Sequence, residues 1–171
     1  MAENKKILTV TIQTKELLFD VMNKTYLTGH AREAEGTKNY EAASNMQASE
    51  DNENSYQLRR SLTNAFTALK SLLGEYLDEN RTTSNNIIPE AIDNDEPLVL
   101  AFKLPSNFNN ASADSLGNGI HAYIADTMIA EWFMITNKED AAGYVSHAEM
   151  SLETVKRALY KRSRPTRPTY D

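Results

Sequence analysis

The stretch that decides the fold is residues 116–159, LGNGIHAYIADTMIAEWFMITNKEDAAGYVSHAEMSLETVKRAL. Its first half carries a stripe of apolar residues at helical spacing: Leu116, Ile120, Tyr123, Ile124, Met128 and Trp132. Its second half repeats apolar residues at alternating steps of four and three: Ala141, Val145, Ala148, Leu152, Val155 and Leu159. Between the halves, Asn137 is a favourable N-cap with acidic residues in the turn that follows. The sequence therefore predicts helices from about Ser112 or Ala113 to Ile135 and from Lys138 to Lys161, joined as an antiparallel hairpin.

Two further helices are predicted upstream. The clearer one spans Ser55–Glu79, where apolar residues again follow a heptad pattern: Leu58, Leu62, Ala65, Leu69, Leu72 and Tyr76. The other begins at Thr14, a capping residue, and is expected to end near Thr28 because Gly29 is a typical helix stop. The polar segment Ala34–Asn54 is expected to be a long loop with one helical turn, of the kind that often binds partners.

Strands are predicted in two regions. In Ile7–Ile12 β-branched residues dominate and apolar and polar residues alternate with a period close to two, and the apolar run Leu98–Leu104 is expected to lie centrally beside it. Ile87–Ile92 is expected to form the first arm of a hairpin with Leu98–Leu104, placed at an edge by Pro89. The predicted class is mainly α with a small β-sheet: an antiparallel bundle of about four helices plus a two- or three-stranded β-ribbon. Residues 1–161 are expected to form one domain and residues 162–171 an extended basic arm.

Charge is distributed unevenly along the chain. The net charge is −6, but residues 156–171 contain six Lys or Arg and one Asp, so this segment carries +5 and the other 155 residues carry −11. Two prolines stiffen the end of the basic run. The candidate partner-binding residues of this arm are Arg157, Lys161, Arg162, Arg164, Pro165, Arg167 and Pro168.

Three interpretations of the arm are open. A basic helix end followed by prolines is often a solvated terminus. Alternatively, the arginines bind the phosphates of a nucleic acid, although the acidic body would repel a duplex. In the third interpretation the arm lies on an acidic patch of a neighbouring subunit, with arginine forks pairing with carboxylates. Trp132 and Tyr160 are candidate interface residues. Trp132 lies at helical spacing from Met128 and Ile135, so it is expected to be a core or interface anchor, with ligand stacking as the alternative.

Residue types that carry catalysis are scarce. The chain has no cysteine, and its three histidines show neither the His-Glu-x-x-His nor the Glu-x-x-His spacing of helical metal sites. Gly117-Asn118-Gly119 is a fragment of a glycine-rich loop without the lysine of a phosphate loop, and the two glycines are expected to permit close helix packing. His121 is expected to be a polar or interface histidine; Asp114, Asp126 and Glu131 are conceivable partners across the bundle, but nothing in their spacing requires the pairing. We therefore expect no enzyme activity, no cofactor and no metal.

Neither a signal peptide nor a membrane span is expected, because the longest strongly apolar stretch is the eight residues Met128–Ile135. The helical hairpin Ser112–Lys161, the β-ribbon around Leu98–Leu104 and the arm Arg162-Ser163-Arg164-Pro165-Thr166-Arg167-Pro168 together resemble a class of phage proteins. These are the small helical head–tail connector, neck or ring adaptor proteins that stack beneath the portal of tailed bacteriophages and prophages.

This resemblance implies a structural virion assembly protein without catalysis. It implies a homo-oligomeric ring that contacts other virion structural proteins, around a lumen through which DNA passes without sequence-specific binding. It also implies a place in the virion, after assembly in the cytoplasm of a bacterial host. The alternative is a cytoplasmic, small helical nucleic-acid-binding or regulatory protein that uses its basic arm.

Overall fold

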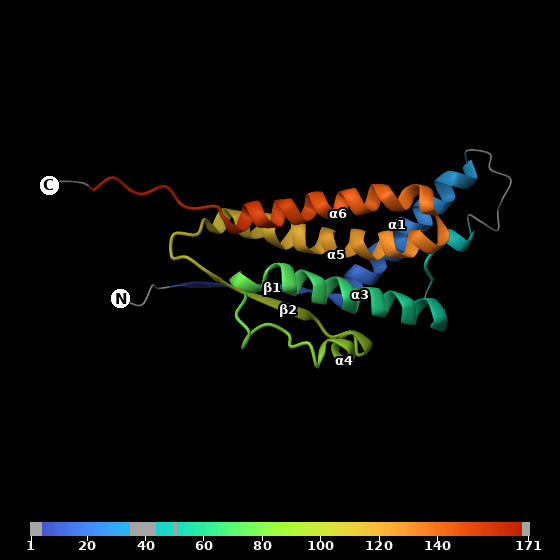
Figure 1. The fold of residues 1–171 in the computed structure, drawn as a ribbon, viewed down its shortest axis with the longest axis horizontal. Helices are drawn as coiled ribbons and strands as arrows, with labels where there is room; N and C mark the ends of the chain where they lie inside the picture. The colour runs from blue at the N-terminus through green and yellow to red at the C-terminus, as the bar shows by residue number, and fades with distance from the viewer. Residues whose placement is uncertain (1–4, 35–43, 50, 169–171) are drawn as a thin grey trace.

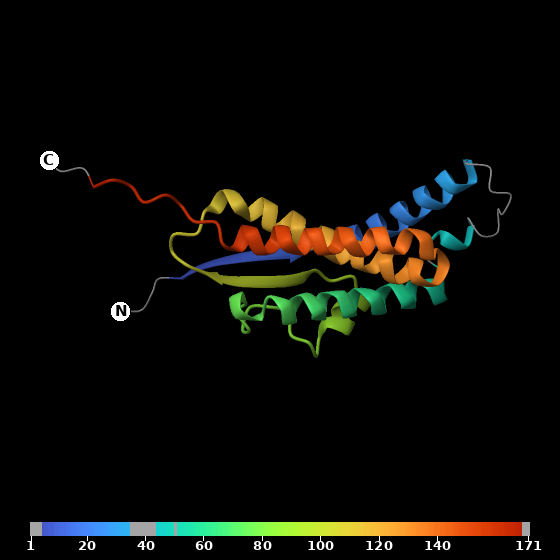
Figure 2. The same ribbon diagram turned by 45° about the horizontal axis from the view of Figure 1, so that its top comes forward.

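The described part of the chain is built from four long helices and a two-stranded sheet (Figures 1 and 2). The computed structural model describes residues 5–34, 44–49 and 51–168. The long helices are α1 (Thr14–Ala34), α3 (Asn52–Leu72), α5 (Ala113–Thr136) and α6 (Lys138–Leu159). The predicted class, mainly helical with a small sheet, is therefore confirmed.

Helices α5 and α6 form the predicted antiparallel hairpin and pack on each other more extensively than any other pair of elements. The connection is the single residue Asn137, whose side-chain carbonyl accepts a hydrogen bond from the Asp140 backbone N–H at 3.5 Å. Gly119 lies directly against α6, since a Cβ built on it would lie 2.8 Å from Val155 Cγ2. Gly117 has no such neighbour within 4 Å, so only one of the two glycines serves close packing.

The sheet pairs β1 (Lys6–Ile12) with β2 (Leu98–Leu104) in antiparallel orientation. Val10 lies opposite Leu100, and the register runs from Lys6 opposite Leu104 to Ile12 opposite Leu98. The β1 strand and the central position of the Leu98–Leu104 strand beside it are as predicted.

The predicted hairpin between Ile87–Ile92 and Leu98–Leu104 is wrong. Residues Ile88–Asp93 form a short helix, α4, with Pro89 in its first turn, where a missing N–H and a fixed φ favour helix initiation. The outer edge of β2 is instead covered by the irregular segment 77–83. The Asp78 N–H donates to Ala101 O at 2.7 Å, and the Thr83 N–H donates to Val99 O at 3.0 Å.

Threonine hydroxyls complete this cover. Thr82 Oγ1 accepts from the Ala101 N–H at 3.1 Å, and Thr83 Oγ1 accepts from the Val99 N–H at 2.9 Å. Val99 and Ala101 of β2 thus have both of their outward backbone groups, the N–H and the C=O, in hydrogen bonds. The hydroxyls of Thr82 and Thr83 therefore accept the hydrogen bonds that a third strand would otherwise accept, and they seal the outer edge of β2 against further pairing.

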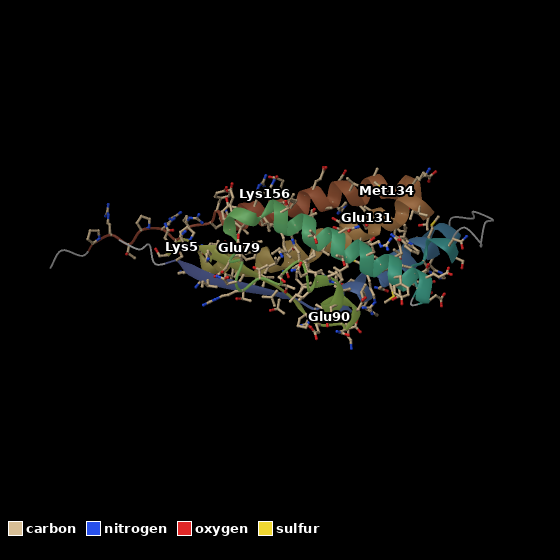
Figure 3. All side chains as sticks on the ribbon, turned by 60° about the horizontal axis from the view of Figure 1, so that its bottom comes forward. Lys5, Glu79, Glu90, Glu131, Met134 and Lys156 are labelled. Atoms are coloured by element: carbon tan, nitrogen blue, oxygen red, sulfur yellow. The ribbon has the colours of Figure 1, made fainter. Side chains whose placement is uncertain are left out.

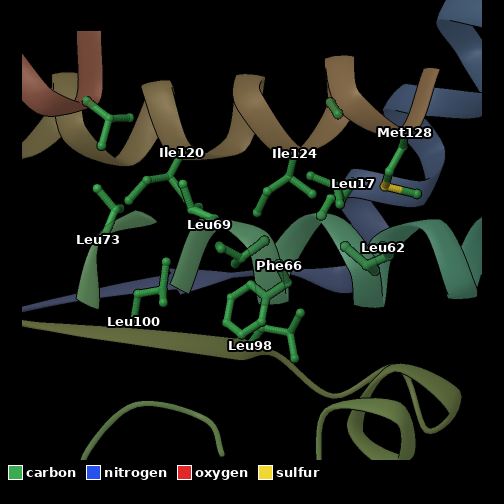
Figure 4. Close-up of a cluster of buried hydrophobic side chains, with 14 of the residues drawn as sticks. Leu17, Leu62, Phe66, Leu69, Leu73, Leu98, Leu100, Ile120, Ile124 and Met128 are labelled. Carbon is green, nitrogen blue, oxygen red and sulfur yellow. The ribbon is translucent and has the colours of Figure 1, made fainter. Parts of the chain in front are cut away.

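The core lies where α3 and α5 meet the inner face of the sheet (Figure 4). Phe66 of α3 points at Leu98 of β2, and Ile120 and Ile124 point toward the same cluster from α5. The largest fully buried side chains include Phe66, Phe102, Phe108, Phe133, Leu17, Leu62, Leu69 and Leu73. Since burial of one such side chain contributes about 1.5–3 kcal/mol, this cluster is the main source of stability.

The largest differences from the predicted helix bounds lie at the ends of α1 and α3. Helix α1 continues through Gly29 to Ala34, because a glycine that keeps helical geometry costs only about 1 kcal/mol and does not have to end a helix. Helix α3 ends at Leu72 and is followed by a 3₁₀ turn at Gly74–Tyr76, so it does not reach Glu79. Leu72, expected in the buried seam, is exposed, and Leu73 is buried in its place. Of the expected loop 34–54, residues 35–43 and 50 lie outside the described chain, and residues 44–46 form one helical turn.

Candidate functional site: a rooted basic arm

The basic arm is fastened to the body at its base. The Asn109 N–H donates to Lys161 O at 3.1 Å, and the Ser163 N–H donates to Asn107 O at 2.8 Å. Phe108, which is buried, lies opposite Arg162 in an isolated antiparallel bridge between these two bonds. The chain therefore leaves α6 in a fixed direction, set by backbone pairing with the turn that precedes α5.

Arg162 caps the C-terminal end of α6 with its side chain. Its guanidinium donates to Leu159 O at 2.7 Å and to Lys161 O at 3.2 Å. These carbonyls lie at and just past the end of the helix, where backbone acceptors lack intrahelical partners and a positive charge is favoured. Arg162, predicted as a partner-binding residue, thus has an internal role that anchors the arm.

Beyond Ser163 the arm projects away from the body. Figures 1 and 2 show it extending past the end of the helices, at the end of the molecule where β1 also begins. Arg164, Pro165, Arg167 and Pro168 are all exposed. Neither arginine forms a hydrogen bond or ion pair within residues 5–34, 44–49 and 51–168. Two arginine forks three residues apart on a proline-stiffened segment are therefore available to an external partner.

The last turns of α6 add further positive charge. Lys156, Arg157 and Lys161 surround a shallow hollow of about 440 Å³ together with Tyr160 and Glu153. Lys156 Nζ lies 3.3 Å from Glu153 Oε1, an exposed pair that contributes little energy. The structure thus brings the predicted Arg157 and Lys161 together at the root of the arm.

Tyr160 and Tyr76 contact each other beside the basic hollow at the root of the arm. Their hydroxyls share a hydrogen bond, and their rings meet edge to face with centroids 5.9 Å apart. The pKa of Tyr76 is raised to about 12. The largest cause is the hydrogen bond to Tyr160; burial and the charges of Tyr160 and Glu75 add smaller contributions in the same direction. Tyr160 is still 62% exposed, so it lies on the surface beside the basic hollow.

Trp132 lies in the core and is only 8% exposed. Its Nε1–H donates to Met46 O at 2.8 Å, which fastens the segment 44–49 to α5. The Ala48 N–H donates to Thr25 Oγ1 at 3.1 Å, so the same segment is also fastened to α1. Of the two interpretations of Trp132, the core anchor describes its position.

An apolar groove between α5 and α6 was not anticipated from the sequence. It has a volume of about 270 Å³ and is lined by Tyr123, Thr127, Ala130, Glu131, Met134, Val145, Ala148, Glu149 and Leu152. Glu131 and Glu149 flank it, and neither forms an ion pair with another described residue. Figure 3 shows Glu131 and Met134 close together on α5. The signal in the sequence was the pair of acidic residues within otherwise apolar helical stripes.

Histidine and aspartate side chains join α1 to α5. His121 Nε2 lies 2.7 Å from Asp20 Oδ2, and Lys24 Nζ lies 3.4 Å from Asp126 Oδ1. His121 thus pairs with Asp20, and not with the conceivable partners Asp114, Asp126 and Glu131, because α1 crosses α5 and brings Asp20 to it. Within the described ranges, no three His, Cys, Asp or Glu side chains are grouped as a metal site would require.

None of the described helices is both long and apolar enough to cross a membrane. Comparison of the chain with protein-family models, with curated protein sequences and with solved structures finds no match.

Proposed function

We propose that this chain is a structural assembly protein whose basic arm is captured by a neighbouring copy in a homo-oligomeric ring. The observation that carries the proposal is the rooted arm: backbone pairing at Lys161 and Ser163 fixes its direction, and the residues that follow are exposed. An arm that is stiffened and aimed before docking loses less conformational entropy when it binds. No catalytic role is assigned to any residue.

The groove between α5 and α6 is the receiving surface on the neighbour. Its apolar floor suits Pro165 and Pro168, and its flanking Glu131 and Glu149 suit Arg164 and Arg167. Arginine–carboxylate pairs are the strongest common surface ion pairs when they are bidentate. Because the arm leaves at the end of α6 and extends away from the body, it reaches the groove of another copy more readily than its own.

Such a contact joins two different surfaces, so repeating it makes a closed ring or an open helical array. A ring is the geometry of a head–tail connector beneath a portal, working with other virion structural proteins. The acidic body carries −11 outside residues 156–171, and an acidic lumen would let DNA pass without holding it. The virion, after assembly in a bacterial cytoplasm, is the proposed location.

The test is a charge exchange in the full chain, followed by light scattering after size exclusion. Replacing Arg164→Glu and Arg167→Glu should reduce the multimer, because the arginines would then face Glu131 and Glu149. Combining these changes with Glu131→Arg and Glu149→Arg should restore it. Lys15→Glu with Arg60→Glu, two exposed positions elsewhere, is the charge-matched control. A chain that is monomeric at every concentration, or an arm variant that assembles like the unmodified protein, would contradict the proposal.

The second candidate is a nucleic-acid-binding protein that contacts phosphates through the arm. The cluster of Lys156, Arg157 and Lys161 at the arm's root favours it, because phosphate binding needs only charge and reach. With about three to five phosphate contacts, the slope of log affinity against log salt should be about −3 to −5. Absence of binding to single- and double-stranded DNA at low salt would eliminate this candidate.

A further inference from the structure

Within residues 5–34, 44–49 and 51–168 no strand or loop pairs with the outer edge of β1, and the hydrogen bonds of β2 show which β1 residues form that edge. Val99 and Ala101 of β2 direct their backbone groups outward, to the segment 77–83. Backbone direction alternates along a strand, so Leu98, Leu100, Phe102 and Leu104 direct theirs toward β1. Their register partners are Ile12, Val10, Leu8 and Lys6. It follows that Ile7, Thr9 and Thr11 direct their N–H and C=O groups away from the sheet.

No other described segment covers this edge. Ile7, Thr9 and Thr11 are exposed, Ile7 to 42%, and no backbone hydrogen bond joins them to a described residue other than those of β2. Figure 3 shows β1, the blue strand that begins near Lys5, at the periphery of the molecule. Among the described residues, the outer edge of β1 is therefore both exposed and unpaired.

Beyond its first residue, this edge strand carries none of the usual protections. Proteins commonly place a charge, a proline or a bulge on an exposed edge to prevent pairing with another strand. Lys6 supplies the one charge of β1, at its first residue, and its Nζ donates to Phe108 O at 3.1 Å. The remaining residues, Ile7–Ile12, read Ile-Leu-Thr-Val-Thr-Ile, with no charge, no proline and high β-propensity. The opposite edge of the same sheet is sealed by Thr82 and Thr83. This contrast indicates an edge kept free for pairing.

We propose that β1 pairs with β1 of a second copy of this chain, antiparallel about a two-fold axis at Thr9. In this register Thr9 faces Thr9 of the partner, Ile7 faces Thr11, and the overlap spans all of β1. The three outward residues are then the hydrogen-bonded ones on both strands, which gives about six inter-strand hydrogen bonds. The product is a four-stranded sheet, β2-β1-β1-β2, across the two subunits.

The side chains favour this occupant. In the two-fold register Lys6 faces Ile12 and Lys5 faces Gln13, so no lysine meets a lysine. The half-buried Leu8 faces Val10 on the inner side, and both gain apolar contact. The basic arm is a poor alternative strand, because Pro165 and Pro168 lack the N–H groups that a ladder requires.

This contact is separate from the arm and joins identical surfaces, so it makes closed pairs. It does not depend on the groove between α5 and α6. Failure of one contact is therefore distinguishable from failure of the other, since variants in β1 and in the arm can be measured in the same full chain.

Cysteine cross-linking tests the register directly, because the chain has no cysteine of its own. Residues paired across a two-fold axis in a hydrogen-bonded site have Cα atoms about 5.5 Å apart, within disulfide range. The full-length Thr9→Cys variant should form a covalent dimer under mild oxidation. Thr67→Cys, at an exposed site on α3, is the control and should remain uncross-linked. Adding Arg164→Glu and Arg167→Glu should leave the Thr9→Cys dimer intact. Equal cross-linking at the two positions would overturn the inference.

A charge-exchange experiment tests the same axis without covalent chemistry. Thr9→Lys and Thr9→Glu each place two like charges together at the axis, and each should weaken pairing by about tenfold or more. Mixing the two variants should restore a heterodimer in sedimentation analysis. Each variant should keep the circular dichroism spectrum of the unmodified protein, because Thr9 is exposed and its N–H points outward. Pairing that is unchanged in both single variants, or mixed variants that stay monomeric while folded, would refute the two-fold register.

Discussion

Gly119 of α5 and Val155 of α6 meet at the tightest point of the helical hairpin, where a Cβ at position 119 would lie 2.8 Å from Val155 Cγ2. Val155 is fully buried and β-branched, so its methyl group has little freedom to move. Gly117, two residues earlier in the same helix, has open space at the corresponding point. The two glycines are therefore a matched pair for separating helix propensity from packing.

Gly119→Ala is expected to destabilise the fold by about 1–3 kcal/mol, because the overpacking exceeds the gain in helix propensity. Gly117→Ala should stabilise it by about 0.5–1 kcal/mol. Urea unfolding followed by circular dichroism measures both, and Val155→Ala in the Gly119→Ala background should relieve the clash. Equal effects of the two glycine substitutions would show that the helices do not approach closely at Gly119.

Thr82→Val is expected to destabilise the protein by about 1–3 kcal/mol. The substitution removes the hydroxyl that accepts from the buried Ala101 N–H and leaves that donor without a partner. Thr67→Val, at an exposed position on α3, is the control and should change the free energy of unfolding by less than about 0.5 kcal/mol. Faster amide exchange at Ala101 in Thr82→Val would locate the effect at the sealed edge of β2.

Trp132→Phe is expected to loosen the segment 44–49, because Met46 O loses the indole N–H that binds it. The loss should amount to about 1–2 kcal/mol, and proteolytic cleavage within this segment should become faster. Tyr56→Phe, which changes an exposed ring on α3, serves as the control. Cleavage at the unmodified rate would show that the Trp132 hydrogen bond does not hold the segment.

Stability should fall with rising pH in a way that depends on Tyr76. Its folded-state pKa is raised from 10.0 to about 12, so the folded state binds this proton more tightly than the unfolded state does. The contribution is complete below pH 10.0 and is lost as the pH rises through about 12. Tyr76→Phe should therefore lose less stability than the unmodified protein between pH 10.0 and about pH 12 in urea unfolding. Tyr160→Phe should behave likewise, and Tyr56→Phe should retain the full decline.

Periodicity was sufficient to predict the long elements. The seam from Ala141 to Leu159 and the stripe from Leu116 to Trp132 define α6 and α5, because apolar faces of more than twenty residues have few other solutions. The short connection at Asn137 then fixed their antiparallel order. Strand β1 was equally clear, since Ile7–Ile12 is β-branched and period two.

Short apolar runs were ambiguous. Ile87–Ile92 was predicted as a strand, yet Ile88, Ala91 and Ile92 are the buried residues of α4, at helical spacing. A pattern of six residues fits both the period of a strand and the period of a helix. Pro89 suits an edge strand, but proline is also favoured in the first turn of a helix. The cover of the outer edge of β2 was missed for a different reason: threonines in a polar linker show no pattern that predicts hydrogen bonds to a strand edge.

The candidate site was predicted in part. The arm residues follow from composition, and the structure places Arg164 and Arg167 on the exposed segment and Arg162 at the end of α6. The groove flanked by Glu131 and Glu149 depends on how α5 and α6 are rotated against each other, which the heptad positions alone do not specify. The pairing of His121 with Asp20 likewise depends on the crossing of α1 over α5.

The threonine-sealed side of β2 has a consequence for how large this protein's sheets become. Because the β2 edge of the described sheet is blocked, another strand can add only at the β1 edge. Pairing with a second molecule therefore occupies the one free edge of each sheet. Growth then stops at the pair. Because Thr82 and Thr83 block the outer side of β2, the β1 pairing proposed above leaves no free strand edge in that sheet from which Ile7–Ile12 could extend a fibril.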